Sequence, residues 1–355
     1  MFEAAMTRVF ELARQGQGLV SPNPLVGAVI LKGGRIIAEG FHAYYGGPHA
    51  EVAAFQALRE DCAGATLVVN LEPCCHTKKQ TPPCVPQIIE RKIARVVIAN
   101  RDPNPQVNGE GIAQLRAQGV EVIEDVMAEE GEALNEAFFH FMRTGRPFVT
   151  LKSAASLDGK TALLSGESQW ITGEAARLDA HLGRLRHDAI VIGGETLRKD
   201  NPALTVRLPD REVTRQPWRI VVSASGKLPA ISQLFCDQHK SRSLVVTQKG
   251  VTVDALPPEQ VIQLSSVAPF AFEELYAELA KRRIQSLWLE GGAQLHTLFL
   301  EARQVQRLVL YLAPMILGQG RPLFDFPLPA LKEAVRLNNL QLTQMGEDLR
   351  ISAYL

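Results

Sequence analysis

The sequence has few aromatic residues, no net charge and no long apolar run. Aromatic residues make up 6% of the 355 residues, and 38 Lys and Arg balance 38 Asp and Glu. This balance argues against a protein built to bind nucleic acid or an anionic membrane. The longest unbroken apolar run, 308–317, contains Pro314, and a membrane-spanning helix needs about 20 apolar residues. The first residues include Glu3 and no apolar segment, which predicts no secretory signal.

Cysteine is also scarce. The chain has five cysteines, an odd number, and four of them fall within residues 62–84. A secreted disulfide framework normally has an even number of cysteines in a shorter chain. The cysteine content therefore predicts reduced thiols in a cytoplasmic protein, some of them held for metal binding or catalysis. The length predicts two domains.

Alternating helical and strand patterns predict two α/β domains. In the first we expect helices at 2–15, 49–59, 84–92, 110–118 and 128–142, and strands at 26–31, 35–39, 66–70 and 95–99. In the second we expect helices at 173–186 and 293–302, and strands at 148–153, 188–192, 218–223, 243–247, 286–290, 306–313 and 348–354.

A stop signal separates the two patterns. Gly145 and Pro147 follow the last predicted helix of the first part, and this combination ends helices. We therefore predict domains at 1–145 and 146–355. The first holds 13 Lys and Arg against 17 Asp and Glu, and the second holds 25 against 21. The small positive excess favours the second domain as the one that binds phosphorylated ligands.

A zinc motif lies in the first domain. His49 and Glu51 begin a predicted helix, Pro73-Cys74 follows a predicted strand, and Cys84 begins another helix. This order is the signature of zinc deaminases. A catalytic zinc takes three protein ligands and keeps one position for water, whose pKa it lowers to about 7. Glu51 can take a proton from the water and pass it to the leaving amine.

Three alternatives stay open at this point. The motif could be a structural zinc site in a binding module, with Cys75 or His76 as a fourth ligand. The domain could deaminate a base in tRNA or DNA, but such an enzyme needs a basic, aromatic groove, and residues 1–145 are net acidic and contain no Trp. Finally, either Cys74 or Cys75 could pair with Cys84; the preceding proline favours Cys74.

The second domain has weaker signals. Gly193-Gly194 and Gly291-Gly292 each follow a predicted strand and precede a predicted apolar helix or turn. Glycines at strand ends let a backbone approach a phosphate, and open α/β sheets bind ligands at such ends. Arg184 and Arg207 are candidates for the substrate phosphate, because guanidinium groups match phosphate oxygens.

Together these motifs resemble the bifunctional deaminase–reductase family of riboflavin biosynthesis. The resemblance runs from about residue 6 to the end of the chain. It is carried by SPNPLVG (21–27), HAE (49–51), LEPC (71–74), TPPC (81–84), RDPNP (101–105), LKSAASLDGK (151–160), SQWIT (168–172), DNPALT (200–205) and EGG (290–292).

The resemblance implies a fold, two reactions and two cofactors. The fold is a cytidine-deaminase-like three-layer α/β domain followed by a dihydrofolate-reductase-like α/β domain. The first domain would use Zn²⁺ to hydrolyse the 2-amino group of 2,5-diamino-6-(5-phosphoribosylamino)pyrimidin-4(3H)-one. The second would use NADPH to reduce the ribosyl chain of 5-amino-6-(5-phosphoribosylamino)uracil to ribityl.

The resemblance also implies roles for individual residues. Zinc falls on His49, Cys74 and Cys84, and the proton shuttle on Glu51. Substrate-binding positions are Asn23, His42, His76, Lys79, Asp102, Ser168, Arg184, Leu204, Arg207 and Glu290. Cofactor-binding positions are Ala154, Trp170, Thr196, Asp200, Ser223 and Gly292. Apolar strands at both ends of the second domain predict a homodimer. The partners predicted are a small phosphoribosyl pyrimidine and a second copy, with no nucleic acid and no membrane.

The sequence departs from the family pattern in the metal loop. The family usually has Ser after its first zinc cysteine, where this chain has Cys75, and the loop to Cys84 is one residue longer. Counting back from Cys84 with the usual spacing leads to Cys75. The choice between Cys74 and Cys75 therefore stays open, as does that between Lys79 and Lys78.

Overall fold

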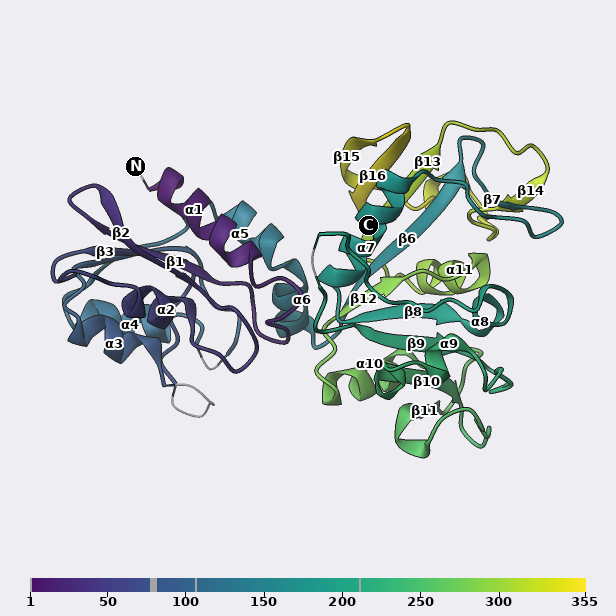
Figure 1. The fold of residues 1–355 in the computed structure, drawn as a ribbon, viewed down its shortest axis with the longest axis horizontal. Helices are drawn as coiled ribbons and strands as arrows, with labels where there is room; N and C mark the ends of the chain where they lie inside the picture. Colours follow the sequence, from purple (N-terminus) through teal and green to yellow (C-terminus); the bar gives the residue numbers. More distant parts are fainter. Residues whose placement is uncertain (1, 77–81, 106, 211) are drawn as a thin grey trace. The chain divides into compact units, whose positions relative to one another are not determined.

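The computed structural model describes residues 2–76, 82–105, 107–210 and 212–355. The chain forms two compact units, Met1–Gly145 and Arg146–Leu355 (Figure 1). None of the helices in the described residues combines the length and the apolar character that a membrane crossing requires.

The described residues of the first unit form a five-stranded sheet in the order β2-β1-β3-β4-β5. Its strands are β1 (Gly27–Lys32), β2 (Arg35–Phe41), β3 (Thr66–Leu71), β4 (Arg95–Asn100) and β5 (Glu121–Ile123). β1 runs antiparallel to β2 and β3, whereas β3, β4 and β5 are parallel. The carboxyl ends of β3 and β4 therefore lie side by side, and the motifs after residues 71 and 100 meet there.

Helices cover both faces of this sheet (Figure 1). They are α1 (Glu3–Arg14), α2 (Ala50–Gln56), α3 (Cys84–Glu90), α4 (Glu110–Ala117), α5 (Ala128–Leu134) and α6 (Glu136–Thr144). α1 packs Met6, Val9 and Phe10 against one face, where they meet β-strand residues such as Val29 and Val68. α2, α3 and α4 bury their apolar sides against the other face. The predicted three-layer α/β arrangement is confirmed.

One predicted helix is wrong in its extent. The pattern predicted a single helix over 128–142, but the chain forms α5 and α6, separated at Asn135. The Asn135 side chain accepts a hydrogen bond from Leu25 N at 2.8 Å and donates one to Leu25 O at 2.9 Å. Because Asn135 is buried and holds a distant segment, tertiary contacts override the helical period here.

The described residues of the second unit form a nine-stranded sheet in the order β11-β10-β9-β8-β12-β6-β13-β16-β15. The strands are β6 (Phe148–Ser156), β8 (Ala189–Gly193), β9 (Trp218–Val222), β10 (Ser243–Gln248), β11 (Val261–Leu264), β12 (Ser286–Leu289), β13 (Arg307–Ala313), β15 (Asn338–Met345) and β16 (Asp348–Tyr354). From β11 to β13 the pairing is parallel, and β16 and β15 extend the sheet antiparallel. A separate pair joins β7 (Lys160–Leu163) and β14 (Gly320–Pro322).

Helices again cover both faces, as Figure 1 shows. They are α7 (Glu174–Arg186), α8 (Gly194–Asp200), α9 (Gln233–Cys236), α10 (Phe272–Lys281) and α11 (Ala293–Glu301), with short 3₁₀ turns at Lys240–Arg242, Pro258–Gln260 and Leu331–Glu333. α10 and α11 pack on one face and α7, α8 and α9 on the other. The second α/β fold is confirmed. Seven elements described in this unit had no sequence prediction: α8, α9, α10, β7, β11, β14 and β15.

A buried arginine in the core of this unit holds the backbone of one loop. Arg219, on β9, is 0% exposed. Its guanidinium forms a two-point ion pair with Asp237 and donates to the carbonyls of Ala203 at 3.0 Å and Leu234 at 2.9 Å. The neighbouring Leu204 has a φ of 48°, a left-handed conformation that non-glycine residues adopt only when their surroundings impose it.

Candidate functional site

Three side chains converge at one end of the first sheet. His49 precedes the first turn of α2, Cys74 follows β3, and Cys84 is the first residue of α3. The His49 Nδ1 atom lies 3.5 Å from Cys74 Sγ and 3.4 Å from Cys84 Sγ. The ligand atoms of all three residues lie within 4.8 Å of one another.

This arrangement fits zinc. A tetrahedral zinc with Zn–N of about 2.05 Å and Zn–S of about 2.3 Å holds such nitrogen and sulfur atoms about 3.6 Å apart. The observed distances of 3.5 and 3.4 Å are close to that value. One imidazole and two thiols are also the donor set that zinc prefers. His49, Cys74 and Cys84 would therefore hold the metal through Nδ1 and two Sγ atoms.

Backbone hydrogen bonds connect the two cysteine segments. The carbonyl of Cys74 accepts the N–H of Cys84 at 3.0 Å and of Val85 at 3.2 Å. Cys75 has a different environment, because its side chain packs against the hydrophobic core between the sheet and α2 to α4. The geometry thus supports Cys74 as the first zinc cysteine.

Serine substitutions separate the two cysteines. We expect Cys74→Ser to lower the bound zinc far below one ion per chain and to reduce deamination by more than about 100-fold, a larger loss than a supporting partner causes. Cys75→Ser should keep both zinc and activity, because in this assignment the Cys75 side chain does not bind the metal. Metal analysis of the two purified variants, together with ammonia release, checks this. Zinc loss in Cys75→Ser alone would assign the ligand to Cys75.

Glu51 lies in the first turn of α2, two residues after His49. It is 3% exposed. Burial, and next the nearby Cys74, raise the pKa of Glu51, and its carboxyl shares a hydrogen bond with Cys84. A buried carboxyl beside the metal ligands has the position that a proton carrier needs.

Asn23 and His42 form a hydrogen-bonded pair next to the candidate metal ligand His49. His42 Nδ1 donates to Pro48 O at 2.8 Å, so its Nε2 accepts from Asn23 Nδ2 at 3.0 Å. The ring of His42 meets that of His49 edge to face, with centroids 5.7 Å apart. Burial lowers the pKa of His42, which keeps the imidazole neutral in this chain. The structure therefore brings Asn23 and His42 beside the metal ligands.

The structure describes the environment of two more predicted residues of the first unit, Asp102 and His76. Asp102 is buried just after β4 and accepts the N–H of Asn104 at 2.9 Å. His76 has a buried Nδ1 atom without a hydrogen-bond partner in the described residues. Lys79 and its alternative Lys78 lie outside the described residues.

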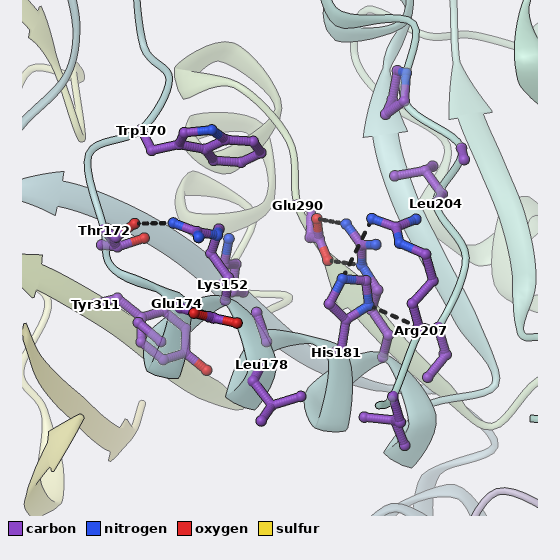
Figure 2. A pocket seen from close by; sticks show the side chains of 18 of the residues that line it. Lys152, Trp170, Thr172, Glu174, Leu178, His181, Leu204, Arg207, Glu290 and Tyr311 are labelled. Carbon is purple, nitrogen blue, oxygen red and sulfur yellow. Dashed lines mark hydrogen bonds and ion pairs between the residues drawn. The ribbon is translucent and has the colours of Figure 1, made fainter. Parts of the chain in front are cut away.

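The second unit contains a cavity of about 930 Å³ along one side of α7. Ile192, near the carboxyl end of β8, and Glu290, just after β12, line it, and parallel sheets bind ligands at such strand ends. Seven of the predicted residues line it: Trp170, Arg184, Thr196, Asp200, Leu204, Arg207 and Glu290. Figure 2 shows Trp170, Glu290, Leu204 and Arg207 arranged around this space.

An ion pair between Arg184 and Glu290 lines the cavity. The Arg184 Nε and Nη2 atoms lie 2.6 and 2.8 Å from the two carboxylate oxygens of Glu290. Arg184 Nη1 donates to Thr205 O at 2.9 Å, and Trp288 Nε1 donates to Glu290 at 2.8 Å. Burial would raise the pKa of Glu290, but Arg184, Lys152 and Trp288 outweigh it and lower the pKa to about 2.

Sequence reasoning named Arg184 but missed the polar stripe on α7 to which it belongs. Glu174, Arg177, His181 and Arg184 all line the cavity. Their spacing of three or four residues places them on one side of a helix, a signal that was readable in the sequence. His181 Nδ1 accepts the N–H of Arg207 at 3.2 Å (Figure 2). Burial and the charges of Arg184 and Arg207 lower the pKa of His181 to about 4.

Four predicted residues do not line the cavity. Ala154 lies on β6 opposite Tyr311, which does line it. Ser223 is buried beside Gly194, and a Cβ on Gly292 would lie 3.8 Å from the Thr196 side chain, so both positions border the α8 segment. Ser168 lies on the loop before Gln169 and Trp170, which do line the cavity.

Comparisons with known proteins agree with both sites. The family model of the RibD C-terminal domain matches residues 147–351, and that of the cytidine and deoxycytidylate deaminase zinc-binding region matches residues 2–100. The riboflavin biosynthesis protein RibD of Bacillus amyloliquefaciens is 40% identical over 363 residues, covering 99% of this chain and 96% of the relative. RibD of Escherichia coli is 38% identical, covering 98% and 97%.

Solved structures show the same fold over the full length. A RibD structure from Acinetobacter baumannii superposes with a TM-score of 0.89 at 33% identity, covering 99% of this chain and 98% of that chain. A diaminohydroxyphosphoribosylaminopyrimidine deaminase/5-amino-6-(5-phosphoribosylamino)uracil reductase from Thermotoga maritima superposes with a TM-score of 0.89 at 38% identity, with the same coverage.

A zinc deaminase unit followed by a reductase unit defines a class of two-domain enzymes that work on pyrimidines. The fold and both sites place the chain in that class. It belongs to the RibD family and is a bifunctional deaminase and reductase of riboflavin biosynthesis. Its cofactors are zinc in the deaminase and NADPH in the reductase.

Proposed function

We propose that the chain catalyses two consecutive steps on one phosphoribosyl pyrimidine. Residues 1–145 hydrolyse the 2-amino group of 2,5-diamino-6-(5-phosphoribosylamino)pyrimidin-4(3H)-one and release ammonia. Residues 146–355 reduce the ribosyl chain of 5-amino-6-(5-phosphoribosylamino)uracil to ribityl with NADPH. The observation that carries this proposal is the convergence of His49, Cys74 and Cys84 beside the buried Glu51. The name of the Thermotoga maritima relative supports the substrates.

In the deaminase, Glu51 moves the proton. Zinc, when bound by the three ligands, supplies a Lewis acid that activates water at neutral pH. Glu51 takes the proton of the attacking water and delivers it to the 2-amino nitrogen, which leaves as ammonia. Asn23, His42, His76, Lys79 and Asp102 position the pyrimidine and its phosphoribosyl chain in our proposal. The hydrogen bond between Asn23 and His42 supports this for two of them.

In the reductase, the protein mainly positions the reactants. The ring-opened ribosylamine is an imine or aldehyde equivalent, and hydride attack on that carbon requires close placement of the nicotinamide. We assign Ser168, Arg184, Leu204, Arg207 and Glu290 to the substrate, and Ala154, Trp170, Thr196, Asp200, Ser223 and Gly292 to NADPH. Because Glu290 already neutralises Arg184, the phosphate is held chiefly by Arg207, which pairs with no carboxylate in the described residues.

One absorbance trace tests both steps. The zinc-loaded chain is mixed with the diaminopyrimidinone substrate and NADPH, and NADPH oxidation is followed. We expect oxidation only after deamination, and immediate oxidation when the deaminated uracil compound is supplied. Stable NADPH with both compounds would overturn the assignment of the second unit. Ammonia release from the first compound then tests the deaminase alone.

We further propose a cytoplasmic homodimer. β15 is the edge strand of the large sheet, and Leu340 and Leu342 on it are 57% and 60% exposed. An exposed edge with leucines favours pairing with a second copy. Sedimentation equilibrium should therefore report twice the 39.0 kDa chain mass, and a single-chain mass at micromolar concentration would contradict it. A site with two thiolate ligands requires a reducing compartment.

A further inference from the structure

A buried carboxylate outside the predicted site joins two segments of the deaminase. Glu72 is 3% exposed and follows β3 directly. Its Oε1 accepts the N–H groups of Gly109, Gly111 and Ile112 at 3.0, 2.9 and 3.2 Å. Its Oε2 accepts those of Gly109 and Asp102 at 2.9 and 3.2 Å. The Glu72 carboxylate therefore accepts backbone N–H groups both from the first turn of α4 and from the start of the segment after β4.

These two segments both belong to the end of the sheet that carries the metal ligands. Leu71 pairs with Asn100 across the parallel strands β3 and β4, and Glu72 N donates to Asn100 O at 3.0 Å. Continuing this register places Asp102 beside the turn that leads to Cys74. The carboxyl ends of adjacent parallel strands form the ligand-binding edge of such a sheet. The Glu72 side chain thus connects the turn that carries a metal ligand with the turn that carries Asp102.

The fit between these segments is tight. A Cβ on Gly111 would lie 2.2 Å from Pro73 O and 3.1 Å from Glu72 Oε1. The first turn of α4 therefore presses directly against the backbone that precedes Cys74. The close packing leaves no space into which the Glu72 side chain could move without displacing its neighbours.

We propose that Glu72 is a positioning residue of the deaminase, which holds Asp102 in register with the metal-ligand turn for substrate binding. The inference rests on the proposed deaminase function. Glu72 itself touches neither metal nor substrate in this assignment and acts through Asp102. A carboxylate is suited to the task, because it offers only acceptors and every group around it donates.

Glutamine at position 72 keeps the shape of the side chain but replaces one hydrogen-bond acceptor with a donor. The amide has one acceptor oxygen and one NH₂ group. If the oxygen faces Gly111 and Ile112, the NH₂ opposes the N–H of Asp102. If it is turned around, the NH₂ opposes the helix instead. The loop yields more readily than the helix, so we expect Asp102 to move.

A double-mutant cycle with Glu72→Gln and Asp102→Ala tests the proposal. In the zinc-loaded full-length chain we expect Glu72→Gln to raise the deaminase KM by about tenfold, with a smaller change in kcat and with one zinc retained per chain. Because Glu72 acts through Asp102, the double variant should resemble Asp102→Ala alone, so that the effects are not additive. Additive effects would overturn the proposal, and so would an unchanged KM.

Controls separate this result from misfolding and from failure of the proposed function. Glu60→Gln changes an exposed glutamate paired with Arg35 and should leave KM unchanged. NADPH oxidation with the deaminated uracil compound should be unaffected in every variant. If Glu72→Gln loses zinc, the cycle is repeated with Glu72→Asp, which keeps the carboxylate; loss of zinc in both would assign Glu72 to the metal loop and overturn its action through Asp102. If the unmodified chain does not deaminate the diaminopyrimidinone, the proposed function itself fails.

Discussion

Replacing Glu51 with glutamine should stop deamination while zinc stays bound. The amide cannot accept the proton of the attacking water, and a positioned acid–base group contributes about 10²–10⁴-fold to such a reaction. We therefore expect the deaminase kcat of Glu51→Gln to fall by about 10³-fold. Ammonia release from the diaminopyrimidinone substrate measures it, and metal analysis should still find one zinc per chain.

The same variant distinguishes a catalytic zinc site from a structural one. A structural site has no use for a carboxyl beside its ligands, so Glu51→Gln would then leave activity and zinc unchanged. NADPH oxidation with the pre-deaminated uracil compound serves as the internal reference, because Glu51 belongs to the first unit. Glu121→Gln, an exposed glutamate paired with Arg95, is the matched control. A fall of less than about tenfold would reject Glu51 as the proton carrier.

Replacing Glu290 with glutamine should damage both the stability and the activity of the reductase. The substitution leaves the largely buried Arg184, whose side chain is 15% exposed, and the nearby Lys152 without their carboxylate. Removing one partner of a buried ion pair costs about 3–5 kcal/mol, which for a unit of this size lowers its Tm by about 10 °C. We also expect reductase kcat/KM to fall by at least about tenfold, because the lining of the cavity loses its charge balance.

Calorimetry and NADPH oxidation measure these two effects, and two further variants interpret them. Glu195→Gln removes an exposed carboxylate paired with Arg198 and Lys199 and should change neither quantity. The double variant Arg184→Met/Glu290→Leu removes both charges of the pair, so stability should recover while kcat/KM for reduction stays low. Full activity in Glu290→Gln would contradict the assigned role of the pair.

The pH dependence of stability has a definite sign for this pair. Glu290 has a pKa of about 2 in the folded chain, below its ordinary 4.5. Its contribution, about 3 kcal/mol by linkage, is complete above pH 4.5 and is lost as the pH falls toward 2. Glu290→Gln should lack this part of the acid slope, which unfolding free energies measured between pH 5 and 3 can show.

Sequence patterns predicted most regular elements, because apolar periodicity reflects which face is buried. α1 is an example, since its stripe at Met6, Val9 and Phe10 is the face that packs on the sheet. β15 was not predicted, because its residues are exposed and the strand forms only through pairing with β16. The break between α5 and α6 depends on the bond between Asn135 and Leu25, which are 110 residues apart.

The same distinction applies to the sites. The three candidate metal ligands, which the structure brings together, were predictable because their order, spacing and neighbouring prolines are local signals. The contacts of Glu72 with the first turn of α4 join residues about 40 positions apart, and those of Arg184 with Glu290 join residues 106 positions apart. The sequence around Glu72 and Glu290 carries no local signal for these partners, because only the fold brings the donor groups to the carboxylates.

The buried Arg219 has a consequence for how the reductase receives its substrate. Because it holds the Ala203 carbonyl from inside the core, we expect Leu204 to keep its left-handed backbone conformation before the substrate binds. Under the proposed assignment of Leu204, the substrate then meets a preorganised wall, and little affinity is lost to ordering a loop on binding. Selection among sugar phosphates would accordingly follow from complementarity to a rigid surface, with little induced fit on this side of the cavity.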